Sequence, residues 1–372
     1  MCKGTARSAA TAAFLTLIFL SGCAGFGDWR GAPEPTPSDR FLLPPQGTDL
    51  VGLVQVTSAR HEDTLLDIAR RYDLGYEEII AANPGVDPWL PGAGTRVVLP
   101  TQFVLPGGAR EGLVLNLASM RLFYFPEPGP GEPAEVVTHP IGIGREGWLT
   151  PQGTMHIIQK KEKPAWTVPE SVRREHAAQG EALPKIVPPG PDNPLGDFAM
   201  RLSNPSYLIH GTNQPYGVGI RVSHGCVRLY PEDIARLFPL VPMGTPVRII
   251  NEPYVAGWRD GQLYLEAHLP LAEDAKRWNG SLEPMEYAVV AKATDLAAAV
   301  SWERARAVAR EARGLPVPIA PGSPELEELL AKAPQVPSVP PWAVSLDEGE
   351  QAVQGAASAD ELADNQSGQP PS

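Results

Sequence analysis

The chain has few cysteines, no long apolar run beyond its first residues and no excess of positive charge. Three cysteines in 372 residues cannot form the disulfide framework of a small secreted domain. No segment after Cys23 is long and apolar enough to be a transmembrane helix. The formal net charge of −12 leaves no basic surface that would neutralise phosphates, so we expect no nucleic-acid partner.

The amino-terminal residues have the order of a secretory signal. Lys3 and Arg7 give it a basic start, and the apolar run Ala9–Leu20 is too short to span a bilayer as a helix. Small residues then lead to Cys23. The segment Leu20–Cys23 resembles the lipobox of bacterial lipoproteins, and an ordinary cleaved signal is the alternative.

The lipobox resemblance implies that residues 1–22 are removed and that the thiol of Cys23 is acylated. The protein is then expected in the periplasm of a bacterial cell envelope, held there by a lipid anchor. Ala24 is not aspartate, which under the enterobacterial sorting rule indicates the outer membrane. Residues 23–49 are rich in Gly, Pro, Ser and Asp and predict a flexible linker from the anchor.

Residues 50–101 predict a small α+β unit with the order strand, helix, helix, strand. Thr64 and Asp67 form a capping pair that opens the first helix, and Asn83-Pro84-Gly85 ends the second. Apolar residues recur at helical spacing between these signals. Short apolar runs at 51–56 and 95–100 predict the two strands.

This unit resembles a LysM module, although Glu62 stands where a glycine is common. That family binds glycans containing N-acetylglucosamine, which implies the glycan strands of peptidoglycan as partners. We expect a separate module, whose deletion weakens wall binding and spares the chemistry of the rest of the chain. The motifs that carry the resemblance are Asp63-Thr64-Leu65, Ile68-Ala69, Ala82-Asn83-Pro84 and the end at Val97, Leu99 and Pro100.

Residues 110–251 predict a mainly β domain with one clear helix. The apolar runs 113–117 and 122–125 have the spacing of a hairpin. Pro231 and the two acidic residues after it open the helix. A proline-rich excursion covers 163–194, and a loop of that length in a compact domain is typically functional or disordered.

The carboxy-terminal part carries weaker signals. A Pro/Ala/acid-rich tail, residues 315–372, predicts disorder apart from a short helix at 326–330. Before it, residues 252–314 form a C-terminal extension. There we expect two strands and one amphipathic helix, at 263–265, 287–290 and 296–312.

Ser223-His224-Gly225-Cys226 is the most informative segment, and it follows closely after His210. With Cys2 in the signal and Cys23 at the lipid site, Cys226 has no intramolecular disulfide partner. A lone thiol kept in an oxidising compartment beside two histidines indicates a nucleophile. The alternatives are a buried small hydrophobic residue and a zinc site made by His210, His224 and Cys226. No Cys-x-x-Cys or His-Glu-x-x-His motif supports zinc.

A cysteine nucleophile needs a base, because a free thiol is only slightly ionised at neutral pH. His210 ends an apolar run and precedes Gly211, which lets a ligand approach the backbone. His224 points the same way as Cys226 if the chain is extended, so both histidines remain candidates. Gly225 permits a tight turn, so that the N–H groups of Gly225 and Cys226 could face a developing oxyanion.

The segments 209–212 and 223–229 resemble the signature of the L,D-transpeptidases with a YkuD-type catalytic domain. The resemblance covers roughly residues 50–270. It implies a mainly β catalytic domain, a YkuD-like β-sandwich or barrel with a short helix, next to the small α+β LysM module. Further matches to the ErfK/YbiS group are Gly142-x-Gly144, Thr150-Pro151-x-Gly153 and Trp166-Thr167-x-Pro169.

The resemblance also implies a role for each site residue. Cys226 is the nucleophile, His210 the proton donor and acceptor, and a backbone carbonyl near Gly211 orients that histidine, with no metal and no cofactor. His224 then orients the substrate or supports the site, as Ser223 and Gly225 do around the thiol. Arg228 stands where some members carry asparagine; it either clamps a stem-peptide carboxylate or forms a structural or solvated ion pair.

The implied reaction is acyl transfer on peptidoglycan stem peptides. Cys226 attacks the carbonyl at the L-centre of the third stem residue, D-alanine leaves, and a thioester forms. An amine of another stem or of a lipoprotein lysine then takes the acyl group. The alternatives are a cysteine-dependent carboxypeptidase or hydrolase on the same scaffold, and a non-catalytic wall-binding lipoprotein.

Overall fold

The predicted signal peptide and the predicted lipidation site Cys23 lie outside the residues that the structure describes, as do most of the predicted linker and the tail from residue 340. Within the described ranges, no helix combines the length and the apolarity needed to cross a membrane. The computed structural model describes residues 39–45, 47–293 and 299–339.

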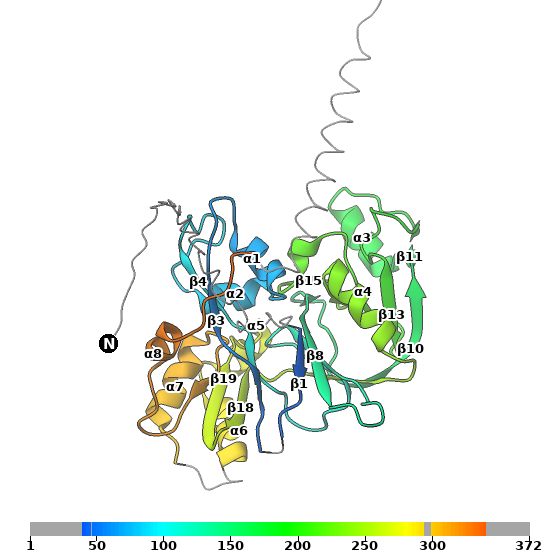
Figure 1. The fold of residues 1–372 in the computed structure, drawn as a ribbon. Helices are drawn as coiled ribbons and strands as arrows, with labels where there is room; N and C mark the ends of the chain where they lie inside the picture. The colour runs from blue at the N-terminus through cyan, green and yellow to red at the C-terminus, as the bar shows by residue number, and fades with distance from the viewer. Residues whose placement is uncertain (1–38, 46, 294–298, 340–372) are drawn as a thin grey trace, which may run out of the picture. The chain divides into compact units, whose positions relative to one another are not determined.

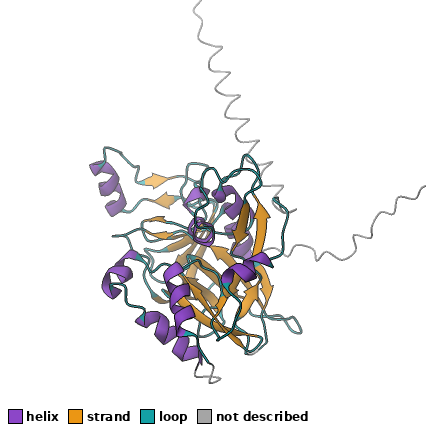
Figure 2. Ribbon diagram, turned by 90° about the vertical axis from the view of Figure 1, so that its left-hand side faces the viewer, coloured by secondary structure: helices purple, strands orange, loops and turns teal. Residues whose placement is uncertain are grey.

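A nine-stranded mixed sheet organises the middle of the chain, which confirms the mainly β domain. Its strands are β1 (Arg40–Leu42), β6 (Gly112–Asn116), β7 (Arg121–Phe125), β8 (Glu135–Pro140), β10 (Gly153–Glu162), β13 (Phe198–Leu202), β14 (Leu208–His210), β16 (Val227–Arg228) and β17 (Pro246–Ile250). They follow the order β1-β8-β7-β6-β17-β10-β13-β14-β16. The predicted sandwich or barrel is therefore one sheet, whose edge strands are β1 and β16. The β6–β17 and β14–β16 pairs are parallel and the others antiparallel. The strands are orange in Figure 2, with helices around them.

Both faces of the sheet are buried at β6 and β7, because successive residues of a strand point to opposite faces. Leu113 and Leu115 belong to a core that includes Ile234 and Leu237 of helix α4 (Pro231–Leu240). Figure 1 shows α4 beside β13. Val114, which lies between the two leucines in sequence, belongs to a second core on the other face. The continuous apolar runs of the predicted hairpin are therefore explained by burial on two sides.

Part of the predicted linker belongs to this sheet. Strand β1 pairs antiparallel with β8, and Phe41 lies opposite Val136. The Phe41 ring meets Phe103 edge-on, with ring centroids 6.2 Å apart. A single apolar tripeptide has no period that sequence analysis could detect, so the linker prediction is wrong for these residues.

The unit predicted at 50–101 has the expected order. It contains β2 (Leu50–Gly52), β3 (Gln55–Ser58), α1 (Leu65–Arg71), α2 (Tyr76–Ala82), β4 (Arg96–Leu99) and β5 (Gln102–Val104). The capping pair is also present: Thr64 Oγ1 accepts from the Asp67 N–H at 3.2 Å, and the Asp67 carboxylate accepts from the Thr64 N–H at 2.8 Å. Strands β3 and β4 pair antiparallel beside the two helices.

This unit is joined to the large sheet by a shared core and by buried polar contacts. Leu65 and Ile79 belong to the same apolar core as Phe123 of β7. Arg121, only 1% exposed, donates to the Glu78 carboxylate at 2.7 and 2.9 Å. The Nδ1 atom of buried His139 lies 3.2 Å from Asp73 Oδ2. The expectation of a separate module is therefore wrong for the fold, because these partners come from both segments.

In the structure the C-terminal extension continues into the predicted tail as far as residue 331, and it forms its own small layer around a β-hairpin. Its elements are β18 (Tyr254–Arg259), β19 (Gln262–Ala267), α5 (Ala272–Trp278), α6 (Glu283–Ala293), α7 (Trp302–Glu311), β20 (Val317–Pro318) and α8 (Leu326–Ala331). The predicted strand at 263–265 is confirmed within β19. The predicted strand at 287–290 is wrong, because these residues lie in α6, where Met285 and Val289 form the buried face four residues apart. The predicted helix at 296–312 is confirmed for α7.

The predicted disorder of the tail is wrong for residues 315–339. Leu315, Val317 and Ile319 are buried, and β20 pairs with β19 of the hairpin. The expected short helix is present as α8. Composition alone pointed to disorder, whereas packing against a hairpin distant in sequence orders this stretch.

Candidate active site

Two parallel strands bring the predicted site residues together. Ile209 of β14 lies opposite Val227 of β16, and both are buried. His210 is the last residue of β14, and Cys226 immediately precedes β16. The sheet therefore holds the imidazole and the thiol on neighbouring strands at its edge.

The loop that carries the thiol is held by Ser223, the last residue of β15 (Arg221–Ser223). Its hydroxyl donates to the Cys226 carbonyl at 2.5 Å and accepts from the Gly225 N–H at 3.1 Å. Gly225 has φ of 99°, which a side chain would strain, and a Cβ there would lie 2.9 Å from the Tyr207 ring. Thr150 donates to the Gly225 carbonyl at 3.0 Å from the other side. Ser223 and Thr150 thus position the thiol loop. This role of Thr150 cannot be read from the Thr150-Pro151-x-Gly153 motif in the sequence alone.

The Gly225 N–H is not available to an oxyanion in this arrangement, because it already donates to Ser223. The prediction that Gly225 and Cys226 both supply donors is therefore wrong for Gly225. The N–H of Cys226 remains the candidate donor. The sequence could not show this, since it does not say where the Ser223 hydroxyl points.

His210 is buried and its orientation is set by the backbone. Its Nδ1 lies 2.6 Å from the Gly211 carbonyl oxygen, so Nδ1 carries the proton and Nε2 is left as the basic nitrogen. Burial, together with the charge of Arg228, lowers the pKa of His210 to about 3, against the opposing effect of its backbone hydrogen bonds. The imidazole is therefore neutral at pH 7 and its Nε2 carries no proton, but the same lowered pKa makes it a weaker base than an exposed histidine. This geometry favours His210 as the base between the two histidines.

The Cys226 thiol is half-buried and un-ionised at rest. Its Sγ lies 3.9 Å from the Ser206 carbonyl oxygen, and no described contact in 39–45, 47–293 or 299–339 joins it to His210. Burial raises the pKa of the thiol, although a backbone hydrogen bond and the nearby Arg228 and Arg201 oppose this effect. The resting pair is thus a neutral thiol and a neutral imidazole, and not an ion pair.

Alkylation of Cys226 by iodoacetamide tests this resting state. Because the thiolate is the reactive form and burial raises its pKa, we expect a slow reaction at pH 7 that rises roughly tenfold per pH unit through the neutral range. The measurement is the alkylation rate of the full chain between pH 6 and 9, followed by mass spectrometry. A rate that is already at its plateau below pH 7 would indicate a thiolate–imidazolium pair instead.

His224 contacts a residue that the sequence analysis did not single out. Its Nε2 lies 3.0 Å from Glu175 Oε2 and 3.0 Å from the Arg145 guanidinium, and its ring meets Trp148 edge-on with centroids 4.8 Å apart. Glu175 also pairs with Arg145. Burial is the main cause that lowers the pKa of His224, so this imidazole too is neutral at pH 7. With its Nε2 in contact with Glu175 and Arg145, His224 is less suited than His210 to act as the base.

A pocket opens beside the thiol loop. Its volume is about 530 Å³, and its walls include His224 and Arg228, which stand two residues before and two after Cys226. The Arg228 backbone is fixed by reciprocal hydrogen bonds with Gly142 at 2.9 Å, and its buried Nε has no hydrogen-bond partner in the described part of the chain. Gly142 must be glycine because a Cβ would lie 2.3 Å from the Gly217 carbonyl oxygen. The first glycine of the Gly142-x-Gly144 motif thus lets the backbone at Gly217 pass close to Gly142, next to Arg228 in the pocket wall.

The three residues of the alternative zinc site, His210, His224 and Cys226, are not directed to a common point. Among the described residues, the group of side chains close enough to share a metal ion is Asp73, His139 and Asp233, which lies at the junction with the 50–101 unit. His210 is turned to a backbone carbonyl and His224 to Glu175, so neither is directed to a common centre with Cys226.

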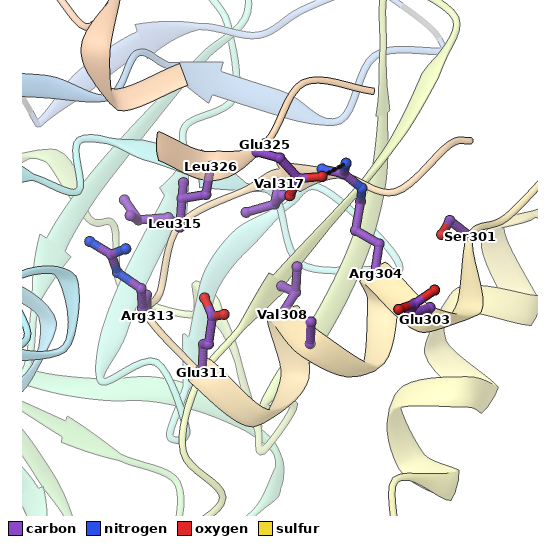
Figure 3. Close-up of a pocket in the computed structure, with 11 residues that line it drawn as sticks. Ser301, Glu303, Arg304, Val308, Glu311, Arg313, Leu315, Val317, Glu325 and Leu326 are labelled. Atoms are coloured by element: carbon purple, nitrogen blue, oxygen red, sulfur yellow. Dashed lines mark hydrogen bonds and ion pairs between the residues drawn. The ribbon is translucent and has the colours of Figure 1, made fainter. Parts of the chain in front are cut away.

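A second hollow, of about 320 Å³, lies in the C-terminal extension between α7, β20 and α8 (Figure 3). Val308, Leu315 and Leu326 line its apolar part. Arg304 at its rim is satisfied by the Ser323 and Pro324 carbonyls, both at 2.8 Å, and pairs with Glu325. It shares no lining residue with the pocket beside the thiol.

The segment that contains the thiol and the imidazole matches a known family of proteins. The family model for the L,D-transpeptidase catalytic domain, YkuD, matches residues 110–249. The chain is 39% identical to the probable L,D-transpeptidase ErfK/SrfK of Escherichia coli K12 over 77% of this chain and 92% of that protein. It is 44% identical to the probable L,D-transpeptidase YbiS of the same strain over 64% of this chain and 78% of that protein.

Among solved structures, an L,D-transpeptidase from Mycobacterium smegmatis is 20% identical to the chain, with a TM-score of 0.29 over 42% of this chain and 63% of that one. The match to ErfK/SrfK covers nearly all of that protein. The chain therefore belongs to the L,D-transpeptidase family and is an acyltransferase.

Proposed function

We propose that this protein is a peptidoglycan L,D-transpeptidase that forms its acyl-enzyme on Cys226. One observation carries the proposal: a neutral imidazole, oriented by the Gly211 carbonyl, stands on the strand next to the only free thiol in the described part of the chain. The substrate class follows from the family, whose members are named for acyl transfer at L,D bonds of the wall peptide.

The first step is thiol attack on the carbonyl at the L-centre of the third stem residue. Rotation about the Cα–Cβ bond of Cys226 takes Sγ from Ser206 towards the substrate, and the S–H proton passes to His210 Nε2. The Cys226 N–H donates to the oxyanion that forms. The same imidazole then returns the proton to the departing amine, so that D-alanine leaves and a thioester remains.

The second step transfers the acyl group to an amine. An amine of a neighbouring stem peptide, or of a lipoprotein lysine, attacks the thioester carbonyl while His210 takes its proton and the thiol is regenerated. Water in place of the amine makes the reaction a carboxypeptidase reaction. Arg228, with a buried Nε that has no hydrogen-bond partner, is suited to hold a carboxylate of the stem peptide.

The setting proposed for this reaction is the bacterial envelope. Acylation of Cys23 would anchor the chain to a membrane, the outer membrane under the sorting rule, and the unit at 50–101 would bind glycan strands of peptidoglycan. Both rest on the sequence motifs. Labelled palmitate that enters the full-length protein and is lost in Cys23→Ala supports the anchor.

Mass spectrometry of purified muropeptides incubated with the soluble chain tests the function. We expect a thioester adduct on Cys226, release of D-alanine and, with an amine acceptor, a crosslinked product. Tripeptide without crosslinked product in the presence of acceptor would identify a carboxypeptidase. No adduct and no change in the muropeptides would leave a wall-binding role.

Substituting the two histidines separates their roles. His210→Ala is expected to slow thioester formation by at least about 10²-fold, which is the usual size of lost general-base help. His224→Ala is expected to cost less, because it removes contacts with Glu175, Arg145 and Trp148 but not the proposed base. The measurement is the single-turnover acylation rate of each variant. An inactive His224→Ala together with an active His210→Ala would reverse the assignment.

A further inference from the structure

Helix α3 (Glu170–Ala178) forms one side of the pocket beside the thiol and has little apolar anchorage. It lies in the proline-rich excursion, after β11 (Trp166–Thr167) and before β12 (Ile186–Val187), which pair with each other. Val172 is its one buried residue. The contacts that hold the pocket side of this helix are therefore mainly polar.

The polar attachment is made by one carboxylate. Glu175 Oε2 lies 3.0 Å from His224 Nε2, and its other oxygen pairs with Arg145. Both carboxylate oxygens are thus occupied by groups of the cleft and not by groups of α3. His176, next to Glu175, bonds to Glu181 of its own segment at 2.8 Å, and only its ring lies towards the cleft, with its centroid 6.1 Å from that of His224.

The contacts of Glu175 with Arg145 and His224 are of a kind that a ligand can replace readily. The Arg145 and Glu175 side chains are 36% and 26% exposed, and ion pairs as open to water as this one contribute little to stability. The second contact is a hydrogen bond to an imidazole that is neutral at pH 7. A ligand carboxylate could replace Glu175 on these groups without breaking any buried apolar contact except that of Val172.

The pocket also has spare capacity for an anion. Its lining carries two arginines, Arg145 and Arg228, and one carboxylate, Glu175. Glu175 pairs with one terminal nitrogen of Arg145, and the buried Nε atoms of both Arg145 and Arg228 have no hydrogen-bond partner in the described part of the chain. The pocket lining therefore holds one more cation than anion, which favours a ligand that brings a carboxylate.

We propose that Glu175 is a built-in substitute for a substrate carboxylate, which α3 places on Arg145 and His224 and withdraws when a carboxylate of the acyl donor binds there. This inference rests on the proposed function, which supplies a donor peptide with free carboxylates. Glu175 is then a specificity-determining residue. It makes entry to the pocket depend on a ligand that can outcompete an internal carboxylate, so neutral peptides leave α3 closed.

The test compares Glu175→Gln with Glu181→Gln, each in the full chain carrying Cys226→Ala so that no turnover occurs. Glu181 is the matched control, because it is an exposed acid of the same segment whose partner is His176. The probes are the stem tetrapeptide ending in D-alanine and the same peptide with all its carboxylates amidated. Affinity is measured by calorimetry, and the position of α3 by trypsin cleavage after Arg174, an exposed site in the helix.

We expect Glu175→Gln to bind the free-acid peptide about tenfold more tightly than the Glu181→Gln control, with no comparable gain for the amidated peptide. We also expect faster cleavage after Arg174 in ligand-free Glu175→Gln, and faster cleavage of the control when the free-acid peptide is added. Unchanged or weaker binding by Glu175→Gln would overturn the inference. So would protection of Arg174 by the free-acid peptide, because α3 would then close on the ligand.

A failure of this inference differs from a failure of the proposed function. If the function is wrong, the chain with an intact Cys226 forms no thioester with the donor, whatever residue stands at 175. If only the inference is wrong, the thioester forms and the binding and cleavage comparisons show no effect of Glu175→Gln.

Discussion

Cys226→Ala is expected to abolish thioester formation and turnover completely. The thiol is the only nucleophile that the described site places beside the oriented imidazole of His210, and alanine leaves nothing for an acyl group to attach to. Cys226→Ser is expected to keep very little activity, because a serine hydroxyl ionises far less readily than a thiol. The measurement is the mass of the intact protein after incubation with donor peptide, followed by the rate of D-alanine release.

The control for this prediction is the thermal stability of the Cys226→Ala variant. Cys226 is half-buried and its sulfur contacts backbone groups of Ser206 and Leu208, which alanine leaves in place, so the melting temperature of Cys226→Ala should stay close to that of the parent protein. Inactivity with an unchanged melting temperature assigns the loss to chemistry. Crosslinking by Cys226→Ala at a rate near that of the parent would show that another residue is the nucleophile.

Arg121→Ala is expected to lower the free energy of unfolding by about 3–5 kcal/mol, the usual cost of leaving one partner of a buried ion pair uncompensated. The Arg121 guanidinium donates to Glu78 and to the Asp73 carbonyl, and it lies 4.2 Å from the centre of the Phe103 ring. These partners come from the 50–105 segment, whereas Arg121 is in β7 and also donates to Thr138 of the neighbouring β8 at 3.2 Å. The measurement is urea unfolding of the full chain.

Arg40→Ala is the matched control for this prediction. Arg40 also pairs with a glutamate across strands, at 3.0 Å from Glu135, but its side chain is 49% exposed, so its loss should cost about 0–1 kcal/mol. If Arg121→Ala and Arg40→Ala were equally mild, the junction between the segments would contribute little. The large sheet would then be stable without the 50–101 unit, as the sequence analysis expected.

The site was largely predictable because its residues stand in short, contiguous motifs. The segment from Ser223 to Cys226 and the segment that ends at Gly211 are each local, and a local pattern is what a single sequence displays. Ser223, His210 and Cys226 therefore come together at one edge of the sheet, and their roles in catalysis stay a prediction. The choice between His210 and His224 could not be made from residues alone, since it depends on the Gly211 carbonyl and on Glu175, which lies 49 positions before His224.

The errors in the fold have a common physical origin. Arg121 and Glu78 are 43 positions apart, and no periodicity or spacing connects them. The residues at 315–319 are ordered by pairing with β19, more than fifty positions earlier, so their proline-rich composition was misleading. Tyr287 to Val290 have strand-forming side chains, but the face that α6 presents to the hairpin decides their conformation. Local signals were reliable, and long-range partners were not visible.

The protonated resting state of Cys226 has a consequence for how long the protein survives. Oxidation of cysteine to sulfenic and higher acids follows thiolate character and exposure. A thiol that burial keeps un-ionised, and that is half-covered by its own loop, is a poor target for peroxide. A thiol held in this protonated form is therefore expected to lose less activity to peroxide between turnovers than a thiolate–imidazolium pair would.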